Sequence, residues 1–487
     1  MTAILSVDCV EKINKFYDCG AYNEALAMIE NIVDQIFCEP LNVAKIFGSP
    51  DLDRLCQSIG EAGLKRLNER SVRRLRDNEL DIVGGHTVVY LVSKLQPSGG
   101  HTAALTDLIR HSLPSRSIVI VTGTCGRTDR NAVKKKFDDL PDISLEYVPR
   151  GNHLSKLEWI QRRLADLSAD TVWLFNHHQD SVAIAAVQPG QGYRVRFYHH
   201  GDHHLCLGVY LDYAEHFDPH PMGFYNCRDN LGIKNNHYLP LIASDLGERP
   251  ARLGFLNNNE LVTCTAGGFN KVEVPYFIRY VDVVPELLRV TGGRHIHIGK
   301  LTPIALWRIR RGLRRYGVDP KSFVYVPYVS SVWRALHEFG VDIYVASFPY
   351  GGGRTLIEVM GAGVPAVIHK HCTSRMLGGF DMAYEGAITW RQPEELFAYL
   401  RSVDAATLGQ QSRRARNQYE KYHREDILRG ALREGHRIDV PSLRMDFQPD
   451  AFLQALQNYR EVTLRGVLYR LMWRNSRHWQ ALLGRLF

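Results

Sequence analysis

Apolar segments of strand length alternate with helix-period segments from His86 onward. A first series contains five apolar runs, at residues 86–95, 117–123, 143–149, 171–178 and 194–200. Between them, residues 101–113 and 154–168 repeat apolar positions with the spacing of amphipathic helices. Strands that alternate with helices predict right-handed crossovers and a parallel sheet.

The same alternation starts again near Leu261. Predicted strands lie at 261–267, 295–300, 323–329, 341–348 and 364–370, and predicted helices at 274–290, 303–317, 330–340 and 353–363. The pattern therefore predicts two successive α/β domains, residues 81–250 and 251–440, with a boundary near residues 245–258. Open α/β sheets bind ligands at the carboxyl ends of their strands, and we expect a ligand site in a cleft between these domains.

The two ends of the chain show helical periodicity without strand signals. Within residues 1–80, two predicted helices flank Gly20 and resemble one tetratricopeptide-type hairpin. No second copy follows, so we expect a helical N-terminal region packed on the next domain and not a peptide-binding array. Residues 441–487 are predicted to form a basic helical tail, which holds five arginines and two tryptophans after residue 463. This tail could lie on an anionic membrane surface through residues 464–487 or pack back on the first domain.

Composition narrows the class of protein. The 487 residues are 45% hydrophobic and 23% charged, which is typical of a soluble globular protein. The net charge of +8 suits anionic ligands but does not by itself indicate nucleic acid. Nine scattered cysteines without CxxC spacing favour a reducing compartment and argue against a structural metal. No signal-like start or long apolar run is present, so we expect a cytoplasmic protein.

The strongest chemical signal is a glycine-rich helix start after the predicted strand at 341–348. Gly351, Gly352 and Gly353 precede a helix whose free N–H groups and dipole attract an anion. Arg354 and Thr355 add a charge and a hydroxyl at the same end. Glu358 lies one turn further along that face and suits the two hydroxyls of a ribose. The pattern therefore predicts a site for a nucleoside diphosphate.

This segment, SFPYGGGRTLIEVMGAGVPAV, resembles the nucleotide-sugar signature of GT-B glycosyltransferases. It is similar to the retaining, sucrose-synthase-like family and to the inverting family of O-GlcNAc transferase and bacterial protein N-glucosyltransferase. Tyr350 stands where the retaining pattern has its first glutamate, which favours inversion. The resemblance implies a GT-B fold of two Rossmann-like domains facing a cleft.

The resemblance also implies roles for residues at other positions of this chain. TAGGFNKVEV and HIGK place Lys271 and Lys300 where basic residues bind the diphosphate, and FVYVPYVS places Tyr328 near the nucleotide base. SKLQPSGGHTAALTDL resembles the acceptor-domain loop, with Gly99, Gly100 and His101. The implied donor is a nucleoside diphosphate sugar, with no cofactor and no metal.

A histidine-rich loop follows the predicted strand at 194–200. YHHGDHHLCLG contains His200, Asp202 and His203, and three roles compete: a metal site, loop structure, or catalysis. An inverting transfer needs a general base, and histidine titrates near neutral pH. A related loop occurs in the resembling inverting family, so we expect His200 or His203 to be the base, with Asp202 orienting a partner or acting itself. His177 and His178 are further acceptor-side candidates.

The predicted function is transfer of a sugar from a nucleoside diphosphate sugar to a glycan, lipid-linked or protein acceptor. We expect a role in bacterial cell-envelope polysaccharide synthesis or protein glycosylation, in the cytoplasm or at the inner face of the membrane. A sugar-nucleotide epimerase of the same fold and a non-enzymatic scaffold are the alternatives. The Asp51-Leu-Asp53 triplet matches the DxD of metal-dependent transferases but lies in the helical region, so we interpret it as chance.

Overall fold

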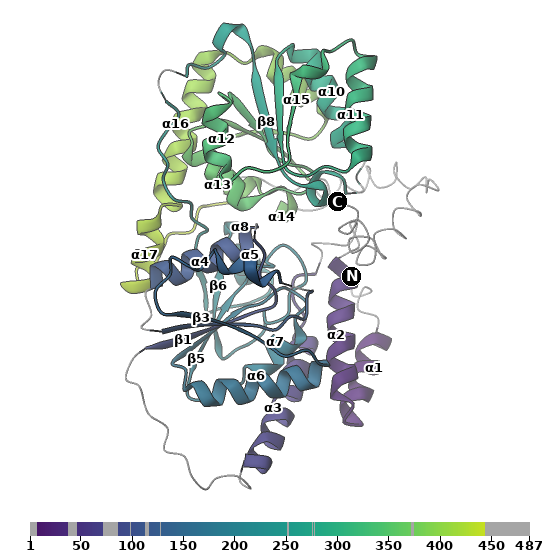
Figure 1. Ribbon diagram of the computed structural model, residues 1–487, viewed down its shortest axis with the longest axis vertical. Helices are drawn as coiled ribbons and strands as arrows, with labels where there is room; N and C mark the ends of the chain where they lie inside the picture. The colour runs from purple at the N-terminus through teal and green to yellow at the C-terminus, as the bar shows by residue number, and fades with distance from the viewer. Residues whose placement is uncertain are drawn as a thin grey trace. The chain divides into compact units, whose positions relative to one another are not determined.

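The computed structural model describes residues 7–37, 46–71, 86–97, 99–112, 116–126, 128–250, 253–274, 276, 278–371 and 375–443. The chain divides into two compact units. Unit 1 comprises the residues up to Leu239 together with Arg429–Val440, and unit 2 comprises Pro240–Leu428 and the residues from Pro441 onward. Both units appear in Figure 1, and each is an α/β layer structure.

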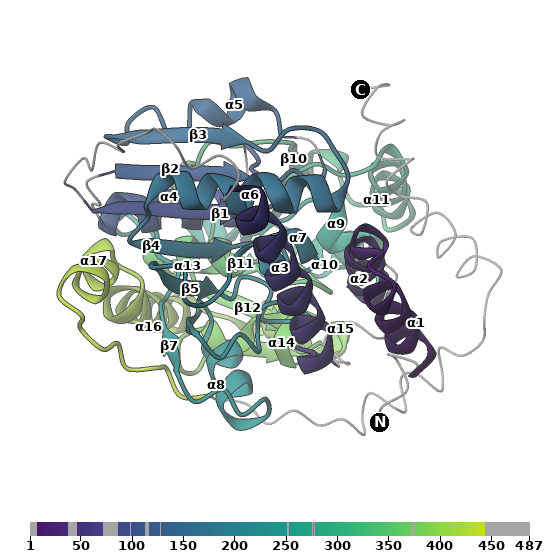
Figure 2. The same ribbon diagram turned by 90° about the horizontal axis from the view of Figure 1, so that it is seen from below.

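Unit 1 is built on a parallel sheet in which the order of strands is β3-β2-β1-β4-β5-β6-β7 (Figure 2). Its strands are β1 (Thr87–Val92), β2 (Arg116–Val121), β3 (Ile143–Tyr147), β4 (Thr171–Phe175), β5 (Arg194–Tyr198), β6 (Ala214–Asp218) and β7 (Asn236–Tyr238). The first five are the predicted strands. The sequence analysis missed β6 and β7, because β6 (AEHFD) mixes charged with apolar residues and β7 has only three residues.

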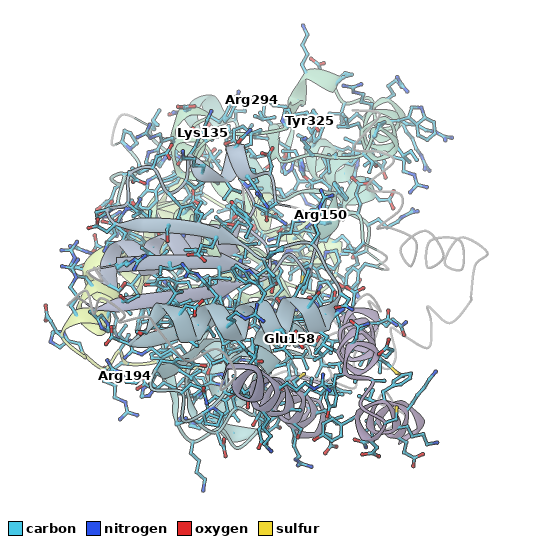
Figure 3. All side chains as sticks on the ribbon, turned by 60° about the horizontal axis from the view of Figure 1, so that its bottom comes forward. Lys135, Arg150, Glu158, Arg194, Arg294 and Tyr325 are labelled. Atoms are coloured by element: carbon cyan, nitrogen blue, oxygen red, sulfur yellow. The ribbon has the colours of Figure 1, made fainter. Side chains whose placement is uncertain are left out.

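Helices cover both faces of this sheet. They are α1 (Val7–Asp18), α2 (Tyr22–Phe37), α3 (Pro50–Ser71), α4 (Gly100–Ser112), α5 (Arg130–Lys134), α6 (His153–Leu167), α7 (Ser181–Ala186) and α8 (Pro221–Asp229). Helices α3, α6 and α7 pack together on one face, while α4 lies on the other (Figure 1). Residues on the outer rim such as Lys135 and Arg194 are exposed (Figure 3).

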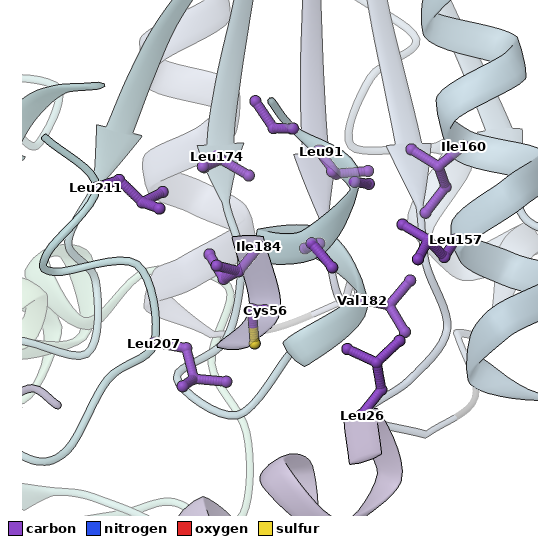
Figure 4. Packing of buried hydrophobic residues seen from close by; sticks show 14 of the residues in the cluster. Leu26, Cys56, Leu91, Leu157, Ile160, Leu174, Val182, Ile184, Leu207 and Leu211 are labelled. Atoms are coloured by element: carbon purple, nitrogen blue, oxygen red, sulfur yellow. The ribbon is translucent and has the colours of Figure 1, made fainter. Parts of the chain in front are cut away.

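The N-terminal helices belong to the core of unit 1. Leu26 of α2 and Cys56 of α3 are fully buried against Val182 and Ile184 of α7, as Figure 4 shows. Backbones also approach closely, because a Cβ added at Gly60 of α3 would lie 1.9 Å from a carbonyl oxygen of α7. Helices α2 and α3 therefore pack directly on the α/β part of unit 1.

The Asp51-Leu-Asp53 triplet lies in the first turn of α3. Asp51 is exposed and pairs with Arg54. Asp53 is buried, and its two carboxylate oxygens accept the backbone N–H groups of Gly208 at 2.7 Å and Tyr210 at 2.9 Å. Asp53 thus anchors the end of the histidine-rich loop, whereas Asp51 forms an exposed pair within α3.

Unit 2 contains a second parallel sheet, with strand order β10-β9-β8-β11-β12-β13. Its strands are β8 (Val262–Ala266), β9 (Arg294–Ile298), β10 (Phe323–Val326), β11 (Ile343–Val345), β12 (Ala366–His369) and β13 (Ile388–Trp390). Its helices are α9 (Phe269–Val272), α10 (Tyr280–Thr291), α11 (Pro303–Arg315), α12 (Val332–Glu338), α13 (Gly353–Gly361), α14 (Arg375–Gly378), α15 (Pro393–Ser402) and α16 (Ala405–Tyr422). Helices α10, α11 and α15 cover one face, and α12, α13 and α16 cover the other (Figure 1).

The division between the units differs from the expected domain bounds at both ends of unit 2. Residues 240–250 join unit 2, because Arg249 pairs with buried Asp342 at 3.2 Å and Asp245 binds Arg416 at 2.6 Å. At the other end, α17 (Glu425–Arg433) leads back to unit 1, where the Arg433 guanidinium donates to the carbonyl of His111 at 2.8 Å.

Among the described helices, none combines the length and the apolar character needed to cross a membrane. The predicted basic tail falls almost wholly outside the described residues, since the description ends at residue 443. Its membrane contact therefore stays a prediction.

Candidate active site

Each sheet reverses its direction of winding at one point, and the candidate residues gather there. In unit 1 the reversal lies between β1 and β4, and in unit 2 between β8 and β11. At such a switch point the loops after the two central strands diverge and leave a crevice at the carboxyl ends, where doubly wound sheets bind ligands.

In unit 2, the glycine-rich segment after β11 leads directly into α13. Gly352 is the N-cap of this helix, and no side chain caps the first N–H groups. Lys271, on α9 after β8, reaches across the switch point and donates from Nζ to the carbonyl oxygen of Gly351 at 3.0 Å. A Cβ added at Gly352 would lie 2.8 Å from that ammonium, so the glycine leaves room for the lysine. The structure thus brings a cation to the predicted anion-binding helix start.

The ammonium of Lys271 lies in a poorly hydrated position. Burial lowers its pKa to about 8, because the charged form loses hydration that the surrounding protein does not replace. The backbone also ties the two loops together, since the N–H of Tyr350 lies 3.4 Å from the carbonyl oxygen of Lys271. An anion at the helix start would restore the lost stabilisation of this ammonium.

The other predicted donor residues take different positions around the same sheet edge. Glu358 is partly exposed on α13, and its Oε2 accepts the backbone N–H of Trp333 at the start of α12 at 3.1 Å. One oxygen of this carboxylate is therefore engaged in structure, which the sequence analysis did not anticipate. Arg354 and Thr355, in the first turn of α13 beside Gly353, are partly exposed.

Lys300 and Tyr328 follow β9 and β10. Lys300 is exposed, while its carbonyl oxygen accepts the N–H of Phe269 at 2.8 Å, which holds the loops after β8 and β9 together. Gly299 makes this possible, because it has φ of +127° and a Cβ there would meet the carbonyl of Gly267 at 2.6 Å. Tyr328 is 66% exposed.

In unit 1, three imidazoles meet at the switch point. His101 of α4 lies with its ring centroid 4.4 Å from that of His177, which follows β4, and 4.6 Å from that of His200, which follows β5. The Nε2 atom of His101 donates to the carbonyl of Phe175 at 3.0 Å. The sequence analysis named all three residues, and the structure brings them together.

These imidazoles are held in their neutral forms and keep unused hydrogen-bonding atoms. Burial and the neighbouring histidines lower the pKa of His200 to about 3, and burial lowers that of His177 to about 4. Within the described part of the chain, the Nδ1 atoms of all three rings are buried without a hydrogen-bond partner. Buried polar atoms normally have partners, so this group is suited to a polar ligand or ordered water.

The remaining acceptor-side predictions lie around this group. Gly99, with φ of +135°, precedes Gly100, the first residue of α4. His178 is buried with its ring beside those of Phe37 and His204, at 4.4 and 4.3 Å, and thus lies on the side of the N-terminal helices. Its surroundings are aromatic and differ from those of His177.

Asp202 makes a histidine contact that the sequence did not reveal. Its Oδ2 lies 2.7 Å from Nδ1 of His220, whereas its Oδ1 lies 3.4 Å from Nδ1 of the more exposed His203. Burial alone would raise the pKa of Asp202, but His220 and His203 hold it below its ordinary value. Gly223 admits the carboxylate, because a Cβ there would lie 2.1 Å from Oδ2. His220 was missed because it follows the unpredicted strand β6.

Comparison with known proteins rests on structure. No family model matches the chain, and no curated protein matches it in sequence. Anabaena HepE in complex with UDP and glucose is 12% identical, with a TM-score of 0.54 over 72% of this chain and 99% of HepE. HepE in complex with UDP-glucose is 11% identical, with a TM-score of 0.53 over 72% of this chain and 98% of HepE. A glycosyltransferase from Rickettsia africae is 12% identical, with a TM-score of 0.55 over 77% of this chain and 99% of its own. The chain therefore has the GT-B fold, as the sequence predicted.

Proposed function

We propose that this protein is a glycosyltransferase that uses a nucleoside diphosphate sugar. The observation that carries the proposal is the ammonium of Lys271 beside the uncapped, glycine-lined start of α13. Helix N-termini and a buried cation together favour a polyanion such as a diphosphate. The similarity to HepE, which was crystallised with UDP and UDP-glucose, supports a UDP-sugar as the donor.

In the proposed reaction, the bond between the anomeric carbon and the diphosphate oxygen breaks while an acceptor hydroxyl attacks. Lys271, Lys300 and the α13 N-terminus would stabilise the charge that develops on the leaving diphosphate. Glu358 keeps one carboxylate oxygen for the ribose, since Oε2 is the one that binds the helix α12 backbone. These groups supply the positive charge without requiring a metal cofactor.

The attacking hydroxyl must lose a proton to a base. The switch-point group of unit 1 offers His200, and Asp202 with His220 offers a second histidine that is oriented by a buried carboxylate. A carboxylate that binds Nδ1 fixes the tautomer in which Nε2 accepts a proton. We therefore add His220 to His200 and His203 as candidate bases for an inverting transfer.

In this proposal the attacking group is a hydroxyl of a glycan, lipid-linked or protein acceptor. The ring atoms of His101, His177 and His200 that have no partner among the described residues suit a polar group of this kind. Mass spectrometry of products formed from each acceptor class would identify it. Incubation with donor alone tests the epimerase alternative, because an epimerase converts the donor without any acceptor.

The donor site is tested by two substitutions. Lys271→Ala should lower kcat by about 100-fold, the cost of losing one group that stabilises a developing anion, and Lys300→Ala should lower it less because that side chain is exposed. Lys321→Ala, at an exposed lysine in the same unit, is the matched control and should have no effect. Full transfer activity in Lys271→Ala would refute the assigned donor site. A scaffold would show no thermal shift with any UDP-, GDP-, dTDP- or ADP-sugar.

A further inference from the structure

Four potential metal ligands form a buried cluster in unit 1, outside the residues discussed so far. His199 directly follows β5, and His216 and Asp218 are alternate residues of β6, which places them on one face of the strand. Cys227 comes from α8. Their exposed fractions are 0% for His199, Asp218 and Cys227 and 3% for His216.

The ligand atoms of these residues lie at the corners of a small tetrahedron. His199 Nδ1, His216 Nε2 and Asp218 Oδ1 are separated by 3.0, 3.1 and 3.2 Å. Cys227 Sγ lies 3.4 Å from His199 Nδ1, 3.4 Å from Asp218 Oδ1 and 3.6 Å from His216 Nε2. A tetrahedral Zn²⁺ with ordinary bond lengths requires about 3.3 Å between nitrogen and oxygen ligands and about 3.5 Å from sulfur to either. The six separations lie within about 0.3 Å of these values.

Hydrogen bonds alone explain this packing less well. Six close contacts join the four atoms, but an ionised Asp218 leaves only three protons to share, one on each imidazole and one on the thiol. Those three donors can all point at the Asp218 oxygen. In that arrangement, the two nitrogens and the sulfur would all be donors, and their contacts with one another would not be hydrogen bonds. A cation at the centre would attract all four ligand atoms, and this attraction would outweigh the repulsion between them.

We propose that His199, His216, Asp218 and Cys227 bind a structural zinc ion. Four protein ligands and complete burial are typical of structural sites, since catalytic zinc keeps a position open for water. A mixed nitrogen, sulfur and carboxylate set in tetrahedral geometry favours zinc among the common divalent metals. The thiol of Cys227 releases its proton when the ion binds.

The groups around the cluster support this arrangement. The side-chain amide of Asn236, on β7, donates to Asp218 Oδ2 at 2.9 Å and to the carbonyl of Phe224 at 2.9 Å. The hydrogen bond from Asn236 fixes the Asp218 carboxylate and leaves Oδ1 directed at the other three ligands. Residues that hydrogen-bond to metal ligands commonly orient them in this way.

A zinc ion here would hold β5, β6 and α8 together at the sheet edge that carries the histidine-rich loop. His200 follows one ligand directly, and His220 follows Asp218 by two residues. The ion would therefore keep the candidate bases in place from inside the protein. The inference does not depend on the proposed transferase activity.

The first experiment measures metal in the full chain, purified under reducing conditions without chelators and without a histidine tag. We expect one zinc per chain by inductively coupled plasma mass spectrometry. Replacement by Co²⁺ should give the visible bands of tetrahedral cobalt together with a thiolate-to-cobalt charge-transfer band. A folded protein that contains no zinc and binds neither Zn²⁺ nor Co²⁺ would overturn the proposal.

The second experiment assigns the ligands. Cys227→Ala should lose the charge-transfer band and most of the zinc, and the protein should melt at a lower temperature. Cys206→Ala is the matched control, because Cys206 is equally buried in unit 1 but its Sγ contacts a backbone carbonyl, that of Leu207 at 3.5 Å. Equal zinc content in both variants would refute the site. If Cys227→Ala does not fold, the cobalt spectrum of the unaltered chain decides whether a thiolate is bound, and its absence counts against the proposal.

Discussion

The two switch points share one topology but carry opposite chemistry. Both sheets have their first and fourth strands at the centre, so both open a crevice at the same position relative to their strands. In unit 2 this position holds glycines, an uncapped helix start and the Lys271 ammonium. In unit 1 it holds neutral, buried imidazoles whose Nδ1 atoms have no hydrogen-bond partner among the described residues.

In the proposed function, the fold determines where a ligand binds while the side chains determine what binds. Glycines and a cation suit a group that leaves as an anion. Neutral imidazoles suit a group that gives up a proton. If the proposed transferase function holds, the chemistry of each switch point can be disrupted separately by substitution in its own unit.

The largest expected effect comes from substitution of Asp202, which should affect the chemistry of unit 1 but not donor binding in unit 2. Asp202→Asn keeps the shape of the side chain but removes the carboxylate that binds His220. Transfer to acceptor should fall by about 100- to 1,000-fold, because general base catalysis contributes a factor of that size. Binding of UDP, measured by calorimetry, should be unchanged.

Asp212→Asn is the control for this substitution, since Asp212 is exposed in the same segment. A variant Asp202→Asn that transfers sugar at the normal rate would remove the histidine loop from the mechanism. A simultaneous loss of UDP binding would instead indicate that donor binding and acceptor activation cannot be disrupted separately.

A second, intermediate effect concerns the N-terminal helices, which are found in unit 1 and have no counterpart among the described elements of unit 2. Asp53→Ala leaves the N–H groups of Gly208 and Tyr210 without their buried acceptor. We expect a loss of about 2–3 kcal/mol in the free energy of unfolding, since each buried unsatisfied group costs about 1–3 kcal/mol. Denaturant unfolding followed by circular dichroism measures it.

The neighbouring Asp51→Ala provides the comparison. Its carboxylate forms only an exposed pair with Arg54, so the stability should change by less than about 0.5 kcal/mol. Equal effects of the two substitutions would mean that Asp53 does not anchor the end of the histidine-rich loop.

The smallest expected effect is the pH dependence of donor binding in unit 2. Burial lowers the pKa of Lys271 to about 8, so its ammonium is charged below pH 8 and increasingly neutral above it. A diphosphate binds the charged form, and affinity for UDP should therefore fall as pH rises, by up to about tenfold per pH unit above 8. Calorimetric titration across this range should show the decline.

Lys271→Met should abolish that dependence, because the substituted side chain does not titrate. Its affinity for UDP should be low at every pH. An unaltered protein whose affinity stays constant from about pH 7 to pH 10 would show that Lys271 does not contact the diphosphate.

Much of the architecture could be predicted from the sequence because it depends on local patterns. Ten apolar runs predicted ten strands, and their alternation with helices predicted parallel sheets. The glycine-rich segment at 351–353 could be located because an anion-binding helix start needs only consecutive residues. Strand β6 could not be located, since its polar residues His216 and Asp218 lie in the interior and break the apolar pattern. Because the strand was not predicted, His220, which follows it, was not identified either.

The sequence by itself determined the fold class, the two sheets, and the segments from which a donor site could be built, because periodicity and glycine placement act over a few residues. Only the tertiary structure decided which side chains meet. Lys271 reaches Gly351 across 80 positions, and Asp53 binds a loop 155 residues away. The proposed zinc ligands come from the loop after β5, from β6 and from α8, so their spacing in the chain carries no recognisable pattern. Such contacts depend on strand order and on burial, which follow from packing the whole unit.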